Sequence, residues 1–124
     1  MNQREMPFFT EVPPADWVES KVVGAWLSWR EAVLWCWRNR PHRGMNENGD
    51  QSTFRHYCAQ VYGLNVHAPH VSRWVNPKTK APMDLPPDLV AAFESFTGHR
   101  GLTQFFARKA KCHVVEEMQA RMAA

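Results

Sequence analysis

The sequence has no long hydrophobic stretch and few cysteines. None of its apolar runs approaches the ~20 residues that a membrane-crossing helix needs, so we expect no membrane-spanning segment. The first residues, MNQREMPFFTEVPPADW, contain no basic segment followed by an apolar one, so they do not resemble a secretory signal. The cysteines Cys36, Cys58 and Cys112 are odd in number and far apart, which is typical of reduced thiols in a cytoplasmic protein.

The motifs that mark enzymes are also missing. The chain contains neither a glycine-rich phosphate loop nor a serine elbow. Cys112 and His113 are adjacent and would point about 100° apart on a helix, so they do not form a nucleophile–base pair. Cys58, His67 and His70 are residue types that bind zinc, but their spacing matches no paired-ligand signature. We therefore expect no enzymatic activity, no metal site and no cofactor.

Acidic residues are absent from residues 51–80, and this gap makes the charge distribution uneven. The net charge of +3 divides into −2 over residues 1–37, +5 over residues 38–80 and zero over the remainder. A basic segment without acidic residues suits contact with the phosphates of nucleic acid. A basic face that only contacts solvent would have the same composition, so charge alone does not decide between the two.

No segment alternates apolar and polar residues as a strand would, and the chain is predicted to be an all-α small helical bundle of about five helices. Its length of 124 residues is enough for one domain. Residues 1–15 are rich in proline and are predicted to be an N-terminal arm, which leaves 16–124 as a single helical domain.

Proline and glycine mark the ends of the predicted helices. Apolar residues at helical spacing predict one long helix over about 16–37, and the polar segment 42–52 is predicted to be a loop. A helix over 54–62, capped by Ser52 or Thr53, ends at Gly63. The remaining predicted helices cover 68–75, the segment PPDLVAAFESFT before Gly98, and about 102 to the C-terminus, with an interruption near 111–113.

The segment AQVYGLNVHAPHVSRWVNPKTK, residues 59–80, has the features of a helix-turn-helix. Ala59 is small enough for two helices to cross closely, and Gly63 is free to adopt positive φ in the turn. Val71 with Trp74 or Val75 would then face the core. The remaining side chains would face outward from the second helix or lie just before it, and they are of types that bind base edges. Basic residues nearby could bind phosphates. The predicted DNA-binding residues are Arg55, Asn65, His67, His70, Ser72, Arg73, Lys78 and Lys80.

The segment VSRWVNPKTKAPMDLPPDLVAAFESFTGHRGL, with the preceding YGL, resembles the phage and prophage regulators of the Cro/CI and CII-type helix-turn-helix group. The resemblance covers about residues 53–110 and implies a sequence-specific, repressor-like transcriptional regulator of phage or prophage promoters. Eight residues separate Gly63 from Val71 where that group has six, so the motif at about 53–76 is a variant with a longer turn.

From this resemblance we expect double-stranded DNA as the partner and the cytoplasm of a bacterial host, at the nucleoid, as the location. Regulators of this size gain affinity by pairing two half-sites, so we also expect a homodimer formed through the N-terminal or the C-terminal helix.

The alternative function is a phage-encoded interaction module that binds a host protein through a tryptophan-rich helix. Its basis is the segment WLSWREAVLWCW, in which Trp26, Trp29, Trp35 and Trp37 lie close together. Tryptophan is common in cores as well as in interfaces, and exposed aromatic residues make strong binding contacts. Two or more of these tryptophans exposed on a flat face would favour the alternative, and burial of all four would remove its basis.

Overall fold

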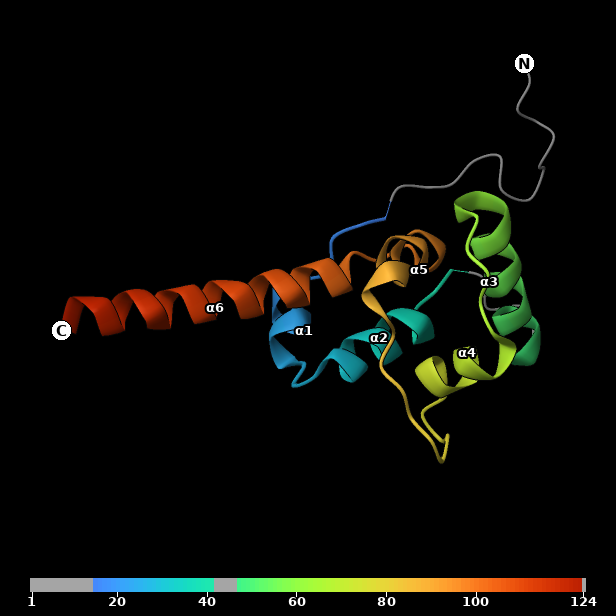
Figure 1. The fold of residues 1–124 in the computed structure, drawn as a ribbon, viewed down its shortest axis with the longest axis horizontal. Coiled ribbons are helices and arrows are strands. Elements are labelled where there is room, and N and C mark those ends of the chain that lie inside the picture. Colours follow the sequence, from blue (N-terminus) through green and yellow to red (C-terminus); the bar gives the residue numbers. More distant parts are fainter. Residues whose placement is uncertain (1–14, 42–46, 124) are drawn as a thin grey trace, which may run out of the picture.

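The computed structural model describes residues 15–41 and 47–123, and all of the predicted arm except its last residue lies outside this part of the chain. The described residues are all-helical, as predicted, and the only extended pairing among them is one isolated bridge between Asp16 and His99. In Figure 1 the C-terminal helix, Gly101–Ala123, projects from a body formed by the other helices. The elements are α1 (Ser20–Ala25), α2 (Trp29–Arg38), α3 (Glu47–Tyr62), α4 (Ala68–Val75), the 3-10 helix η2 (Pro87–Leu89), α5 (Val90–Thr97) and α6 (Gly101–Ala123).

The long helix predicted over 16–37 is wrong, because the chain forms two helices there. Trp26 and Ser28 both have extended backbone, which separates α1 from α2. The Ser28 hydroxyl accepts a hydrogen bond from the backbone N–H of Glu31 at 3.2 Å, and the Glu31 carboxylate accepts one from the N–H of Leu27 at 3.0 Å. The sequence Ser28-Trp29-Arg30-Glu31 has the Ser-x-x-Glu pattern of a capping box, here with the Glu31 carboxylate bound to the N–H before the cap, and it is a helix-start signal inside an otherwise continuous apolar pattern.

Further helix boundaries differ from the prediction, and the segment 86–97, predicted as one helix, forms the 3-10 helix η2 followed by α5 from Val90. α3 begins at Glu47, so Ser52 and Thr53 lie inside this helix and neither is its cap. α6 is continuous from Gly101 to Ala123, without the expected interruption near 111–113. With α1 and α2 separate, the described residues contain six α-helices where about five were expected.

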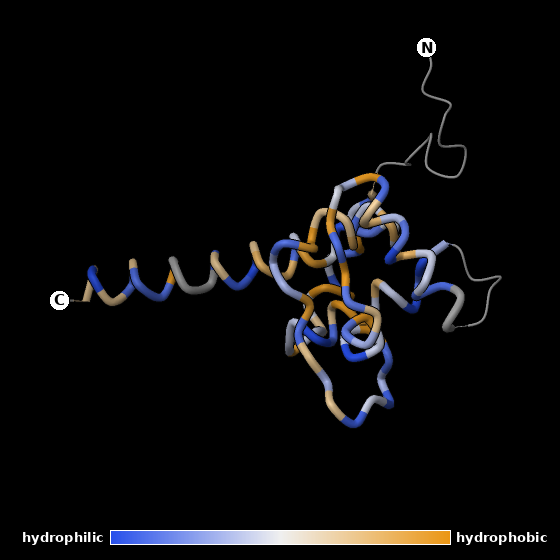
Figure 2. Tube along the Cα trace, turned by 45° about the vertical axis from the view of Figure 1, so that its right-hand side comes forward, coloured by the Kyte–Doolittle hydropathy of each residue, from blue (hydrophilic) through white to orange (hydrophobic). Residues whose placement is uncertain are grey.

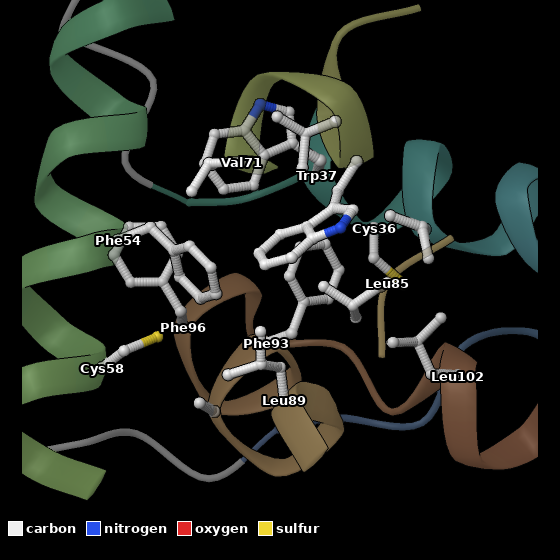
Figure 3. Close-up of a cluster of buried hydrophobic side chains, with 14 of the residues drawn as sticks. Cys36, Trp37, Phe54, Cys58, Val71, Leu85, Leu89, Phe93, Phe96 and Leu102 are labelled. Atoms are coloured by element: carbon white, nitrogen blue, oxygen red, sulfur yellow. The ribbon is translucent and has the colours of Figure 1, made fainter. Parts of the chain in front are cut away.

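The core lies between α2, α3, α4 and α5 and is built around Trp37. The Trp37 ring stacks on Phe93 and Phe96, with centroids 6.1 and 5.9 Å apart, and meets Phe54 edge to face at 6.0 Å. Figure 3 shows these rings pointing toward one another from α2, α3 and α5. Because aromatic residues bury large apolar areas, this cluster is the main hydrophobic contribution to the fold.

A buried ion pair joins the end of α2 to the start of α3. The guanidinium of Arg40 donates to the carboxylate of Asp50, through Nε at 2.7 Å and also through Nη2, and its Nη1 donates to the Trp37 carbonyl at 2.6 Å. The same guanidinium lies over the Trp37 ring at 4.3 Å. Since a buried charge without a partner is costly, the pair holds α3 against the end of α2.

α6 is anchored at its first turns and then leaves the body. The buried Glu94 carboxylate accepts hydrogen bonds from the Thr103 N–H at 2.7 Å and from its hydroxyl at 2.8 Å, which caps the positive end of α6. Leu102 and Phe105 are buried, whereas the described side chains after Phe105 are exposed. Figure 2 shows the rest of α6 extending away from the other helices. In the described part of the chain, no helix combines the length and the apolar character needed to span a bilayer.

The four clustered tryptophans are used within the fold. Trp37 is fully buried, and the other three are partly buried and packed against the core. Trp26 lies against Trp35 with ring centroids 5.7 Å apart, and the Trp29 indole N–H donates to the Leu85 carbonyl at 2.9 Å. None of the four is exposed on a flat face. The exposure that would have favoured the alternative function, a tryptophan-rich helix that binds a host protein, is therefore not found.

Candidate nucleic-acid interface

α4 extends over Ala68–Val75, which are the predicted limits of the second helix of the motif. Its inner side buries Val71, Trp74 and Val75, as predicted, against α2 and α3. The opposite side therefore faces solvent, and at 100° per residue Arg73 lies near its centre. An eight-residue helix is about 12 Å long, so this exposed side could span three to four base pairs.

The connection between α3 and α4 is a five-residue turn, 63–67, that starts at Gly63. The backbone of Gly63 has φ 65°, and its N–H donates to the Ala59 carbonyl at 3.2 Å while that of Leu64 donates to the Cys58 carbonyl at 3.0 Å. These two hydrogen bonds end α3 at a glycine, as predicted. Glycine suits this position because a residue with a Cβ is strained at this φ.

The expected role of Ala59 is wrong. We expected this residue where α3 and α4 cross, but it is exposed. α3 faces the core through Phe54, Tyr57 and Cys58. Ala59 follows Cys58 and is rotated about 100° from it, which directs it outward.

The predicted DNA-binding residues lie on three consecutive parts of the chain: α3, α4 with its preceding turn, and the loop after α4. The His67 and His70 rings touch, with centroids 4.8 Å apart, and His70 also packs near Trp74 at 6.1 Å. His70 and Ser72 are only partly exposed, so less of each is available to a ligand than we expected from their positions. Those that are exposed are Asn65, His67, Arg73, Lys78 and Lys80, and those partly buried are Arg55, His70 and Ser72.

The loop between α4 and η2 is held by hydrogen bonds to backbone and side-chain oxygens. The Asn76 side-chain oxygen accepts from the N–H of Lys78 at 3.0 Å, and the Asn76 carbonyl accepts from Thr79 at 3.2 Å. The N–H of Met83 donates to the Arg73 carbonyl at 3.1 Å, which returns the loop to the end of α4. Lys78 and Lys80 therefore stand on an ordered loop beside α4, the loop that protrudes below α4 in Figure 1.

Two arginines position this region, and only one of them was in the prediction. Arg30 on α2 donates to the carbonyls of Arg73 at 3.1 Å and Asn76 at 3.0 Å, so it holds the C-terminal end of α4. No local sequence signal marks Arg30, because its partners are more than 40 residues away. Arg55, predicted to bind phosphate, donates its Nε to the Val66 carbonyl at 3.1 Å and thereby also fixes the turn.

The residues considered for zinc do not form a ligand set. Cys58 is fully buried in the core, where burial raises the pKa of its thiol to about 11, whereas His67 is exposed. Among the residues whose side chains the structure describes, no three histidine, cysteine, aspartate or glutamate residues come together as metal ligands would.

No family model matches the chain, and no curated protein and no solved structure is significantly similar to it.

Proposed function

We propose that the protein is a sequence-specific DNA-binding regulator of the repressor-like phage or prophage type. One observation supports this proposal: the exposed side of α4 and the loop that follows it form one basic surface. Arg73 lies at the centre of that side of the helix, and the hydrogen-bonded loop carries Lys78 and Lys80. Residues 51–80, which include all of this surface, contain no acidic residue. Such a surface attracts a polyanion and presents donors to base edges.

In this proposal α4 lies in the major groove. Arg73 binds base edges, since arginine is the commonest reader of guanine, while Ser72 and His70 flank it. Asn65 and His67 approach from the N-terminal end of α4, and Lys78 and Lys80 hold the backbone beyond its C-terminal end. The role of Arg30 is to keep α4 and the loop in one orientation, so that base and phosphate contacts form together.

We further propose a homodimer formed through the C-terminal helix. One side of α6 carries exposed apolar side chains, those of Val115, Met118 and Met122, and Met122 is 82% exposed. Their spacing of three and four residues places them on the same side of the helix. α1, the other candidate, buries its Val23 and packs on α6 within the same chain. Sedimentation equilibrium tests this: Met118→Lys should shift dimer to monomer, whereas Ala120→Lys, about 200° around the helix, should not.

The DNA-binding test is a fluorescence-anisotropy titration with the DNA upstream of the protein's own gene and with random duplex, at two salt concentrations. We expect tighter binding to the upstream DNA and a log-affinity that falls with log salt according to the number of phosphates contacted. Arg73→Ala should cost about 1–3 kcal/mol on the preferred site and relax its specificity, whereas Lys78→Ala should weaken binding to all sequences alike.

Lys21→Ala on α1 is the matched control, because it removes the same charge from an exposed position outside the proposed surface. Its affinity for both duplexes should equal that of the unmodified protein. Absence of binding to either duplex at low salt would contradict the proposal, as would equal losses from Arg73→Ala and Lys21→Ala.

A further inference from the structure

A shallow, open hollow of about 230 Å³ lies between the outer side of α3 and the turn that follows it. Ser52, Arg55, His56 and Ala59 are spaced along α3 at intervals of three and four residues, so they share one side of the helix. The turn closes the other side. The lining residues are Ser52, Arg55, His56, Ala59, Asn65 and Val66.

The hollow depends on Ala59 being small. This residue is part of the lining and contributes only a methyl group. A long side chain at the same position would fill the space between Arg55, His56 and the turn.

Arg55 is held so that part of its guanidinium stays available. Its Nε donates to the Val66 carbonyl in the turn, and no other hydrogen bond from Arg55 is found within the described residues. The two terminal amino groups of the guanidinium therefore remain as donors at the hollow, in the fork arrangement that suits bidentate contact with an oxyanion.

The other polar lining groups are also hydrogen-bond donors. Ser52 offers a hydroxyl and Asn65 an amide. Asp50 is the nearest acidic residue before Ser52 whose side chain the structure describes, and it is buried and paired with Arg40. The next acidic residue along the chain is Asp84. The hollow thus combines a fixed cation with two neutral donors, Ser52 and Asn65, and has no carboxylate in its lining.

We propose that this hollow is a binding site for a phosphate group, with Arg55 as its charged ligand and Ser52 and Asn65 as further donors. A phosphate has several acceptor oxygens and a negative charge, which matches a set of donors around one guanidinium. The phosphate could belong to the backbone of a nucleic acid or to a free phosphate compound. The site does not require that the protein regulates transcription, so the two proposals can fail separately.

The test uses the full-length protein and inorganic phosphate. Backbone amide NMR spectra are recorded during titration with potassium phosphate and, at equal ionic strength, with potassium chloride. We expect saturable shifts with phosphate, at millimolar concentration, for the amides of Arg55, His56 and Asn65, and no saturation with chloride.

Ala59→Met is the decisive variant, because methionine keeps the helix and fills the hollow. It should weaken phosphate binding at least fivefold. Gln60→Met is the matched control: it places the same side chain at the next, exposed position of α3, which does not line the hollow, and should change phosphate binding less than twofold. Absence of saturable phosphate binding, or equal binding by both variants, would overturn the proposal.

The source of the phosphate is decided by repeating the comparison with duplex DNA. If the hollow takes a backbone phosphate, Ala59→Met should lower the affinity for all duplexes alike and reduce the slope of log-affinity against log salt by about one. If the hollow takes a free phosphate compound, Ala59→Met should weaken the binding of inorganic phosphate at least fivefold and leave any duplex binding unchanged. Either result supports the site, and only the first joins it to DNA binding.

Discussion

Gly101, the first residue of α6, lies close against Trp26 and Cys36. A Cβ atom at this position would lie 2.7 Å from the Trp26 ring and 2.9 Å from the Cys36 sulfur, both of which are held by packing. Gly24 on α1 is different, because a Cβ there would lie 3.4 Å from the flexible, exposed end of Arg108. The same substitution should therefore have opposite effects at the two positions.

We predict that Gly101→Ala lowers the free energy of unfolding by about 1–3 kcal/mol through overpacking. Gly24→Ala should leave it unchanged or raise it by up to about 1 kcal/mol, since alanine favours the helical backbone more than glycine does. Urea unfolding of both variants at one pH checks this. A Gly101→Ala protein as stable as the unmodified one would show that α6 and Trp26 are farther apart than the structure places them.

At the scale of elements, α4 depends on a contact that comes from another helix. Arg30 reaches from α2 to the last carbonyls of α4, which are the ones without partners inside that helix. We predict that Arg30→Ala lowers stability by about 1–2 kcal/mol, because two hydrogen bonds from a charged donor are lost. Hydrogen exchange at the Asn76 and Thr79 amides should become faster in this variant.

Arg38→Ala provides the comparison for Arg30→Ala, because Arg38 is exposed at the end of the same helix. We expect its stability to change by less than about 0.5 kcal/mol and its loop amides to exchange at the original rate. Faster exchange in both variants would mean that the loss of a charge on α2, rather than the contact with α4, controls the loop.

The far part of α6 is an element whose described side chains add nothing to the core. Met118 and Met122 are 55% and 82% exposed. We predict that, at low protein concentration, a chain ending at Lys111 has a free energy of unfolding within about 0.5 kcal/mol of that of the full chain. Its circular dichroism signal should show less helix. If α6 joins two copies, the full chain alone should become more stable as its concentration rises. A large loss of stability at low concentration would show that this part packs on the body.

At the scale of the whole molecule, buried thiols make stability depend on alkaline pH. Burial, with a smaller contribution from the Glu94 carboxylate, raises the pKa of the Cys36 thiol to about 12, and burial raises that of Cys58 to about 11. The ordinary pKa of a cysteine is 9.0. Below pH 9 both thiols are protonated in the folded and the unfolded chain, so their full contribution to stability is present there.

As the pH rises from about 9 to about 12, the unfolded chain loses these protons first, and we predict that the free energy of unfolding falls. Tyr57, whose pKa burial also raises, adds to the same trend. Urea unfolding between pH 8 and pH 11 measures the slope, and a Cys36→Ala/Cys58→Ala variant should retain only the part that comes from Tyr57 and other groups. Equal slopes in the two proteins would contradict the prediction.

Much of the helical arrangement could be predicted because its signals are local. Pro69 and the Asn76-Pro77 pair define the limits of α4, and Gly63 and Gly98 end α3 and α5 with φ of 65° and 80°. These residues restrict or free their own backbone angles, so their effect does not depend on distant partners. The capping box at Ser28 was a signal of the same kind, but the apolar pattern across it concealed the break between α1 and α2.

The sequence by itself therefore determined the helical class, both limits of α4, the C-terminal end of α5, and a segment of thirty residues without acidic side chains. Only the tertiary structure decided that Ala59 faces outward and lines a hollow, that Arg30 holds the end of α4, and that Gly101 lies against Trp26. The reason is physical: backbone preferences act over a few residues, whereas packing joins residues that are far apart in sequence, and which side of a helix is buried depends on the elements that meet it.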